Sequence, residues 1–322
     1  MDLWELCDLA TPWCLCIVAT LRIAEHMTAG ISETGALARA AECDAEVLNC
    51  VLGHLAGKGI FERVRPGEWA LNDAARGLLN PMLQLGLDLN GIGGRMAYAW
   101  STLPKFVRTG RPAYHEVFGR PFWEDLEANP DIAASFDALI GPAGHGDFNA
   151  SFPLTAGWEA IRTVVDVGGG TGAMLAAMLR ADPQLRGTLV ELPRTVARAA
   201  ETFQAAGVAD RVTAVAQSFF DPLPAGADLY LLRGVLNNWP DAEAAKLLKR
   251  CADAARPHGR VVVLKGIDQD GALPHLSIDK ILTGGKQRTV SEFRDLARQS
   301  GLEVVAAGRE GSGYFTVECR PL

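Results

Sequence analysis

A glycine-rich turn behind an apolar run, with an acid further along the chain, carries the clearest chemical signal. Residues 164–167 form the apolar run, which includes Asp166, and the turn after it contains Gly168 and Gly170. Glu191 ends the next apolar run, about 20 residues on. A glycine turn lets a ligand lie against bare backbone, and an acid at that distance can accept both hydroxyls of a ribose. The pattern predicts a site for a cofactor that contains a nucleoside.

Two features bear on which cofactor this is. Residues 168–173 nearly satisfy the dinucleotide fingerprint Gly-x-Gly-x-x-Gly/Ala, with Ala173 in the last position. However, roughly half of the chain precedes the turn, whereas a dinucleotide-binding fold normally opens with its nucleotide strand. Asp166 would also repel a pyrophosphate and attract a cationic amino-acid group. The residues therefore favour a cofactor with a cation, and a nicotinamide dinucleotide or a purely structural turn remain the alternatives.

The overall composition argues against several classes of function. The net charge is −7, so we expect neither a nucleic acid nor an anionic membrane as partner. No basic residue precedes Arg22, and the apolar residues 12–21 are too few to span a bilayer. The seven cysteines are scattered without a Cys-x-x-Cys pair. We expect unpaired thiols, no metal site and a cytoplasmic location.

The C-terminal part of the chain, residues 156–322, alternates β runs with amphipathic helical stretches. This alternation is typical of a parallel sheet covered by helices on both faces. The last two runs, residues 303–307 and 314–319, are joined by too short a link for a crossover helix, so we expect an antiparallel hairpin. The other strands are expected at residues 163–167, 188–191, 212–216, 228–232 and 260–265. Helices are expected at residues 171–180, 194–206, 242–255 and 290–300.

The first 90 residues have a winged-helix pattern, in which helices precede a small hairpin. Residues 3–27 favour a helix that Pro12 breaks or kinks. Shorter helices are expected at residues 32–41 and 45–57, and a hairpin at residues 59–64 and 68–71.

Such modules often bind DNA, but this one has the wrong charge for that role. No Lys or Arg lies between Arg39 and Lys58, so the second short helix cannot neutralise phosphates. We expect residues 1–90 to form a dimerisation domain of a homodimer instead. The side chains that we expect the partner to cover are Leu15, Ile17, Val18, Leu21 and Ile23.

Residues 91–155 separate these two parts and are mainly helical and rich in aromatic side chains. Such side chains can line an apolar cavity beside the cofactor or simply fill a core. We expect a linker that contributes to the substrate pocket. The candidates for contact with substrate are Trp100, Phe136, Ile140 and His145.

Four motifs follow one another in an order that resembles the small-molecule O-methyltransferases. They are DVGGGTG from Asp166, LVELP from Leu189, QSFFDPLP from Gln217 and LLRGVLNNWPD from Leu231. These enzymes use S-adenosylmethionine (SAM) in plant phenolic and bacterial natural-product pathways, and the likeness covers nearly the whole chain. It is nearest to members that act on polyketide aromatics. The resemblance implies a Rossmann-like class I methyltransferase sheet of the α/β class, preceded by an α-helical winged-helix dimerisation domain.

The resemblance also implies a role for individual residues. Asp166, Gly168 and Gly170 would hold the methionine end of SAM, and Glu191 its ribose. The other side chains implied to bind the cofactor are Ser218, Phe219, Arg233 and Trp239.

The chain departs from this family where the chemistry takes place. The family uses His-Asp-Trp, in which the His removes the proton from the acceptor hydroxyl, whereas this chain has Asn237-Asn238-Trp239. An amide can orient a hydroxyl but cannot take its proton. Lys265 occupies a position where the family has an acid, and Ser218 one where it usually has Asp.

Three functions therefore remain open. Methyl transfer to a hydroxylated aromatic can proceed without the His, because alignment of donor and acceptor lowers the barrier by about 7–11 kcal/mol and a general base by only about 3–5. His275, His145 and Asp279 are the candidates for a substitute base or acid. Alternatively, bound SAM acts as a fixed positive charge in a decarboxylation, hydroxylation or ring closure. The third alternative is an inactive, SAM-binding regulatory protein.

Overall fold

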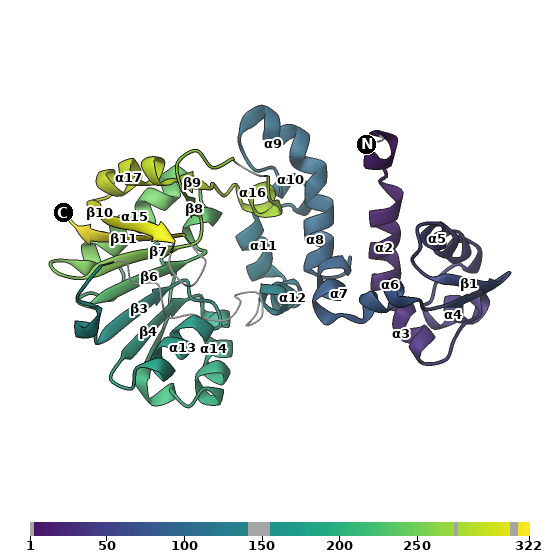
Figure 1. Ribbon diagram of the computed structural model, residues 1–322, viewed down its shortest axis with the longest axis horizontal. Coiled ribbons are helices and arrows are strands. Elements are labelled where there is room, and N and C mark those ends of the chain that lie inside the picture. Colours follow the sequence, from purple (N-terminus) through teal and green to yellow (C-terminus); the bar gives the residue numbers. More distant parts are fainter. Residues whose placement is uncertain (1–2, 141–154, 274–275, 310–314) are drawn as a thin grey trace. The chain divides into compact units, whose positions relative to one another are not determined.

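The computed structural model describes residues 3–140, 155–273, 276–309 and 315–322 (Figure 1). It divides into two compact units. Unit 1 comprises Met1–Ser101 and Glu124–Leu139, and unit 2 comprises Thr102–Trp123 and Ile140–Leu322. His145 and His275, which the sequence analysis names as candidate site residues, lie outside the described residues.

Unit 1 opens with a helical stretch that is interrupted just before Pro12. The carboxylate of Asp8 accepts hydrogen bonds from the backbone N–H groups of Ala10 (2.9 Å) and Thr11 (3.1 Å). Pro12 lies in the first turn of the new helix, where its missing N–H removes no intrahelical bond. The helices of this stretch are α1 (Leu3–Leu6), α2 (Ala10–Thr20) and α3 (Ile23–Thr28).

Two helices and a hairpin follow, in the order predicted from residues 32–71. The strands pair antiparallel, and the buried Trp69 donates its indole N–H to the hydroxyl of Thr34 (2.9 Å). Asp44 caps the second helix by accepting from the backbone N–H of Val47 (2.9 Å). These elements are α4 (Thr34–Ala40), α5 (Ala45–Gly57), β1 (Glu62–Arg65) and β2 (Glu68–Ala70).

A partly buried ion pair joins two of the remaining helices of unit 1, α8 and α11. Arg95 donates from Nε to the buried carboxylate of Asp125 (2.8 Å). The remaining helices are α6 (Asp73–Arg76), η1 (Gly77–Leu79), α7 (Pro81–Leu87), α8 (Ile92–Ala99), most of α11 (Phe122–Ala128) and α12 (Pro130–Ile140).

The prediction that a partner covers Val18 and Ile23 is wrong. Both side chains are buried in the core of their own unit, at 1% and 0% exposure. A helix with an apolar face shows the same pattern whether it packs on its own chain or on a partner, so the sequence could not separate the two cases. The large apolar side chains that this region exposes are Leu3, Leu6, Leu9 and Trp13.

Unit 2 is built on a seven-stranded sheet in the order β10-β11-β7-β6-β3-β4-β5. Five strands are parallel, and β11 runs antiparallel to both β7 and β10, which confirms the predicted parallel sheet with a terminal hairpin. The strands are β3 (Thr163–Val167), β4 (Arg186–Glu191), β5 (Val212–Ala216), β6 (Leu229–Arg233), β7 (Arg260–Leu264), β10 (Leu302–Arg309) and β11 (Phe315–Pro321).

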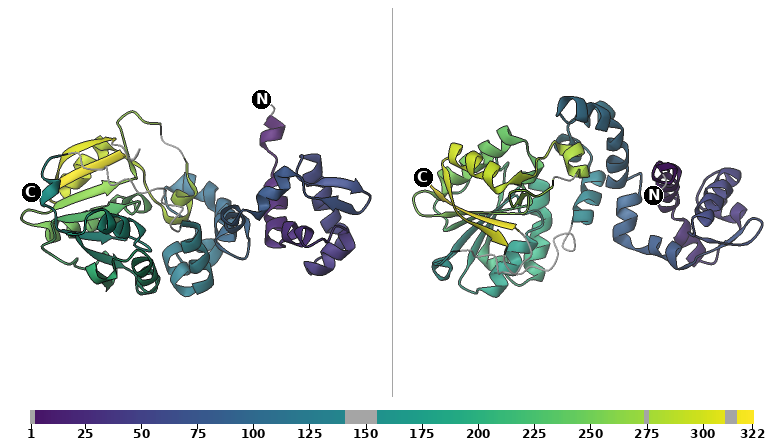
Figure 2. Two further views of the ribbon diagram at one scale, coloured as in Figure 1. Left: turned by 60° about the horizontal axis from the view of Figure 1, so that its bottom comes forward. Right: turned by 45° about the horizontal axis from the view of Figure 1, so that its top comes forward.

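Helices cover both faces of this sheet (Figures 1 and 2). Successive side chains of a strand point to opposite faces. Val165 therefore packs in the cluster that includes α15 and α17, whereas its neighbour Val164 packs in the cluster that includes α13 and α14. The four helices are α13 (Ala173–Ala181), α14 (Pro193–Ala205), α15 (Asp241–Ala255) and α17 (Val290–Gln299).

Several short elements complete unit 2, and most of them were not predicted. They are η2 (Trp100–Thr102), which begins in unit 1, α9 (Leu103–Thr109), α10 (His115–Phe118), η4 (Trp158–Ala160), η5 (Ala209–Arg211), η6 (Leu236–Asn238), α16 (Ile278–Thr283) and the parallel pair β8 (Ile267–Asp268) and β9 (Arg288–Thr289).

The described residues include no helix with both the length and the apolar character that a membrane span requires.

A buried ion pair joins β7 to β11. Arg260 contacts Glu318 through Nη1 and Oε1 at 2.5 Å, and both side chains are buried. The same guanidinium donates to the hydroxyl of Thr155 (2.7 Å) and the carbonyl of Ala156 (2.6 Å). Because a buried charge is costly without its counter-charge, each member of the pair depends on the other.

We predict that Glu318→Gln lowers the free energy of unfolding by about 3–5 kcal/mol, because it leaves the Arg260 charge buried without its counter-charge. The exposed pair Lys249–Asp253 provides the control, since Asp253→Asn should change stability by less than about 1 kcal/mol. Urea unfolding followed by circular dichroism measures both. Equal losses in the two variants would contradict the prediction.

Candidate cofactor and catalytic site

The residues predicted to bind the cofactor lie at the carboxyl ends of the parallel strands. The glycine turn follows β3, Glu191 ends β4, Arg233 ends β6 and Lys265 follows β7. In an open parallel sheet these ends meet at one edge, which is where such folds bind their ligands. The sheet order, with β3 between β4 and β6, brings the turn next to both Glu191 and Arg233.

The turn holds its backbone against neighbouring side chains too closely for any residue but glycine. Gly168 has a φ of 69°, in the left-handed region, and a Cβ built there would lie 2.9 Å from Val235 and 3.4 Å from the ring of Phe219. A Cβ on Gly169 would lie 2.2 Å from Oδ2 of Asp166. Packing within the protein thus requires glycine at positions 168 and 169, and the prediction that the turn also presents bare backbone to a ligand stays a prediction.

Asp166 is the buried acid at the centre of the site. It is 1% exposed, and neither carboxylate oxygen has a hydrogen-bond partner among the described residues. Burial, together with the negative charge of Glu191, raises the pKa of Asp166 to about 7, and the positive charge of Arg233 acts in the opposite direction. Buried polar groups nearly always have partners, so two buried oxygens without one suit a cationic ligand.

Glu191 is fixed against the glycine turn. Its Oε2 accepts from the backbone N–H of Gly170 (3.2 Å), and its Oε1 accepts from that of Leu192 (2.8 Å). A carboxylate oxygen can accept more than one hydrogen bond, so both oxygens can also accept from the hydroxyls of a ligand. Both acids thus lie against the glycine turn.

Aromatic rings flank the other side of the turn. The ring of Phe219 lies 6.0 Å from that of Trp239 between centroids, and Phe220 lies 4.9 Å from the same indole. Trp123 stacks on Trp239 at 6.1 Å with an angle of 22° between the planes. The hydroxyl of Ser218 accepts from the backbone N–H of Phe220 (3.2 Å), which shapes this turn. Phe219 and Phe220 meet Trp239 edge to face, so these rings form an apolar cluster beside the turn.

Asn237, which stands in place of the family His, is packed between two glycines. A Cβ on Gly266 would lie 2.5 Å from the Cβ of Asn237. A Cβ on Gly285 would lie 2.1 Å from the backbone carbonyl oxygen of Asn237. The side-chain Oδ1 of Asn237 is buried, with no hydrogen-bond partner among the residues that the structure describes. This oxygen can accept a hydrogen bond from a hydroxyl group, but it is not a base at neutral pH.

Lys265 and Asp279 form a second pair of opposite charges near Asn237. Lys265 has a φ of 64°, a left-handed conformation that side chains other than glycine rarely adopt and that often marks functional sites. Partial burial raises the pKa of Asp279, and the positive charge of Lys265 acts in the opposite direction. Asp279 is nevertheless an exposed residue, so solvent limits how far its pKa can rise.

The expected substrate contacts are not gathered in this way. Trp100 and Phe136 belong to unit 1, and Ile140 ends α12. For these three, contact with substrate stays a prediction. Arg288 was not singled out from the sequence, although it is buried beside Asn237 and Trp239 in the structure. A capping box at Thr289 and Glu292 marks the start of α17 just after it, but no sequence pattern signals a buried arginine.

Residues 100–303 match the model of a protein family described as an O-methyltransferase domain. The chain is 38% identical to 2,7-dihydroxy-5-methyl-1-naphthoate 7-O-methyltransferase of Streptomyces carzinostaticus, over 95% of this chain and 94% of the relative. It is 41% identical to aclacinomycin 10-hydroxylase RdmB of Streptomyces purpurascens, over 95% and 84%.

A solved structure agrees with these relatives over the entire chain. It is an O-methyltransferase (NcsB1) from neocarzinostatin biosynthesis in complex with SAM and 2-hydroxy-5-methyl naphthoic acid. The TM-score is 0.87 at 36% identity, and the match covers 100% of this chain and 99% of the other. The chain therefore belongs to the O-methyltransferase family, whose relatives include SAM-dependent enzymes of natural-product biosynthesis.

Proposed function

We propose that the protein transfers a methyl group from SAM to a hydroxyl of an aromatic, polyketide-type acceptor. The observation that carries the proposal is the buried carboxylate of Asp166, which has no hydrogen-bond partner among the described residues and lies under a turn where Gly168 and Gly169 leave no room for a side chain. A sulfonium-bearing amino acid is a cation that such a carboxylate attracts. When bound, SAM supplies an activated methyl group.

The residues around the turn fit the remaining parts of this cofactor. Glu191 has capacity to accept from ribose hydroxyls, and the ring of Phe219 lies beside Gly168, where an adenine could stack. Arg233 lies near enough to Asp166 for its positive charge to oppose the rise in the pKa of that acid. Ser218 and Trp239 lie next to Phe219 and complete the proposed set.

Asn237 would orient the acceptor instead of deprotonating it. Its buried Oδ1 can accept a hydrogen bond from the hydroxyl group of the aromatic substrate. Because an amide takes no proton, the acceptor must ionise readily or another group, such as Asp279, must serve. A hydroxylated aromatic acid meets the first condition, and the naphthoate relative and the naphthoic acid in the solved structure support this class of acceptor.

A second function is favoured by one specific observation. A relative that is 41% identical over 95% of the chain is named a hydroxylase. In that case the same site would bind SAM as a fixed positive charge that stabilises developing negative charge on the substrate, with no methyl transfer. Asn237 is compatible with both functions, since neither requires it to act as a base.

We further propose that residues 1–90 serve dimerisation in a cytoplasmic homodimer. Exposed apolar side chains near the start of the chain support this proposal. They are Leu3 and Leu6 in α1, Leu9 just before α2, and Trp13 in α2. An exposed apolar cluster of this kind is commonly an interaction site.

We predict that Asp166→Asn stabilises the ligand-free protein while weakening SAM binding. Folded and unfolded states both hold the Asp166 proton well below pH 4, and both have lost it well above pH 7. Between these values only the unfolded state releases it, so wild-type stability falls as pH rises. The variant has no such proton, and its advantage should grow to about 4 kcal/mol above pH 7. Urea unfolding at a series of pH values measures this.

SAM affinity should fall about tenfold or more in Asp166→Asn by calorimetry, because the cation loses its counter-charge. In the wild type, affinity should fall as pH drops through 7, since binding requires ionised Asp166. Asp228 is the matched control: its carboxylate accepts three hydrogen bonds of 2.9 Å, and these lower its pKa. Asp228→Asn should destabilise the protein and leave SAM affinity unchanged. Unchanged affinity in Asp166→Asn would remove the basis for the site.

The two functions separate by mass spectrometry of one incubation. The protein is mixed with SAM and 1,4-dihydroxy-2-naphthoic acid or related hydroxylated aromatic acids, in air and with a reductant present. Methyl transfer gives S-adenosylhomocysteine and a product heavier by one CH2, which we expect. A product heavier by one oxygen, with SAM intact, supports the hydroxylase function instead. Tight SAM binding without any reaction of any acceptor would leave the binding-protein alternative.

The homodimer is tested by the mass in dilute solution, which should be about twice the 34.4 kDa of one chain. Leu6→Asp together with Leu9→Asp should shift it toward the monomer, because charges would be buried at the interface. Val107→Asp, at another exposed apolar residue, serves as control. A monomer mass for the wild type at micromolar concentration would refute the dimer.

A further inference from the structure

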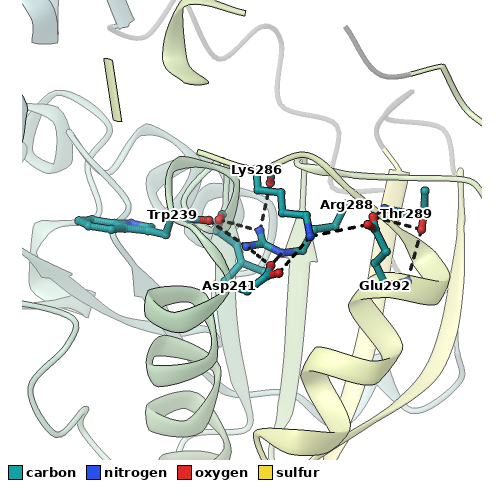
Figure 3. A network of polar contacts seen from close by, with 7 residues as sticks. Trp239, Asp241, Lys286, Arg288, Thr289 and Glu292 are labelled. Atoms are coloured by element: carbon teal, nitrogen blue, oxygen red, sulfur yellow. Dashed lines mark hydrogen bonds and ion pairs between the residues drawn. The ribbon is translucent and has the colours of Figure 1, made fainter. Parts of the chain in front are cut away.

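Arg288 places a guanidinium group in the interior of unit 2, at the end of the sheet that carries the site. The residue is 1% exposed and begins the short strand β9. Its Nε donates to Oδ1 of Asp241 at 2.9 Å, and its Nη2 lies 2.9 Å from the same oxygen. Figure 3 shows the guanidinium between Asp241 and the backbone of Trp239, with the indole of Trp239 directed away from it.

The other bonds of this guanidinium reach the segment that carries Asn237. Nη1 donates to the carbonyl of Leu236 (3.2 Å), and Nη2 donates to the carbonyl of Trp239 (2.8 Å). These two carbonyls bracket Asn237 and Asn238. One side chain thus holds both ends of the short helix η6 at fixed distance.

Within the described part of the chain, few other hydrogen bonds fix the shape of this segment. Within it, the N–H of Asn238 donates to Val235 (3.1 Å) and that of Trp239 to Leu236 (3.3 Å). The Asn238 side chain donates to the carbonyl of Gly234 (3.1 Å). A single 3₁₀ turn with such long bonds has little stability of its own, so its position depends on contacts from outside.

The charges around Arg288 are balanced, which keeps the guanidinium in place. Asp241 also contacts Lys286 (3.0 Å), and Lys286 lies 3.6 Å from Glu292. The carbonyl of Lys286 accepts a further bond from Nη1 of Arg288 (3.0 Å). Two cations and two anions therefore alternate in one network, and the five N–H donors of Arg288 each have an oxygen within reach.

The same stretch of chain also packs on Asn237. Gly285, three residues before Arg288, lies so close to the Asn237 carbonyl that no side chain fits there. Trp239, at the other end of the segment, contacts Phe219 and Trp123. A shift of η6 would therefore displace Asn237 together with the indole of Trp239.

We propose that Arg288 is a positioning residue, which holds η6 by its two carbonyls and so places Asn237 against the acceptor. The inference rests on the proposed function for the role of Asn237, but not for the effect on η6. A lysine cannot replace this arginine, because an ammonium group lacks the planar fork that spans two carbonyls and a carboxylate.

The test compares Arg288→Lys with Arg260→Lys in the full chain. Arg260 is the matched control, since it is also buried and paired but begins β7, whereas the site lies beyond the other end of that strand. Both variants should lose stability. Only Arg288→Lys should lower kcat, measured at saturating SAM, by about 10–100-fold per SAM-binding site. Equal kcat in the two variants, after correction for the folded fraction, would overturn the proposal.

A second measurement needs no turnover and so separates this inference from the proposed function. Amide hydrogen exchange of the peptide that contains residues 234–240 should become faster in Arg288→Lys and stay as in wild type in Arg260→Lys. Asp241→Asn, which keeps the guanidinium but removes its counter-charge, should show the same acceleration if Arg288→Lys does not fold. Exchange that stays at the wild-type rate in this peptide would overturn the proposal, even if every acceptor proved inert and methyl transfer were abandoned.

Discussion

A carboxylate that is buried with no hydrogen-bond partner among the described residues is the constraint on which the rest of unit 2 depends. Asp166 lies near the end of an interior strand, beneath a turn in which Gly168 and Gly169 leave no room for a Cβ. Such a group is tolerated only where the surrounding structure is over-determined. Two strands on one side of β3 and four on the other, with helices on both faces, provide that rigidity. In the proposed function, the stability lost at Asp166 is the source of its affinity for the cation of SAM.

The remaining residues of the site come from segments far apart in sequence, and each is held by packing instead of by its own secondary structure. Phe219 and Trp239 lie after different strands and meet as rings, and Asn237 is held between Gly266 and Gly285. A site without an obvious base must rely on alignment of its reactants, and alignment tolerates little displacement. The close packing around Asn237 is consistent with that demand.

The sequence predicted what is local and missed what depends on tertiary contacts. The strands, the covering helices and the half of the site around Asp166 and Glu191 follow from short patterns of apolar residues and glycines. Arg288 could not be predicted, because arginine is usually exposed and its carbonyl partners lie about 50 residues away in sequence. Val18 and Ile23 were predicted to be covered by a partner chain, because an apolar helix face has the same pattern there as in a core. In the structure the core of unit 1 covers both.

The place of β11 has a consequence for how unit 2 is made. This strand comes after β10 in the chain but lies between β10 and β7, where Val317 and Cys319 are fully buried. Until residues 315–321 have left the ribosome, β7 has one edge unpaired and β10 has no neighbour in the sheet. During synthesis the incomplete sheet would therefore expose an unpaired edge that is prone to aggregation. Protection by chaperones matters most just before this segment emerges.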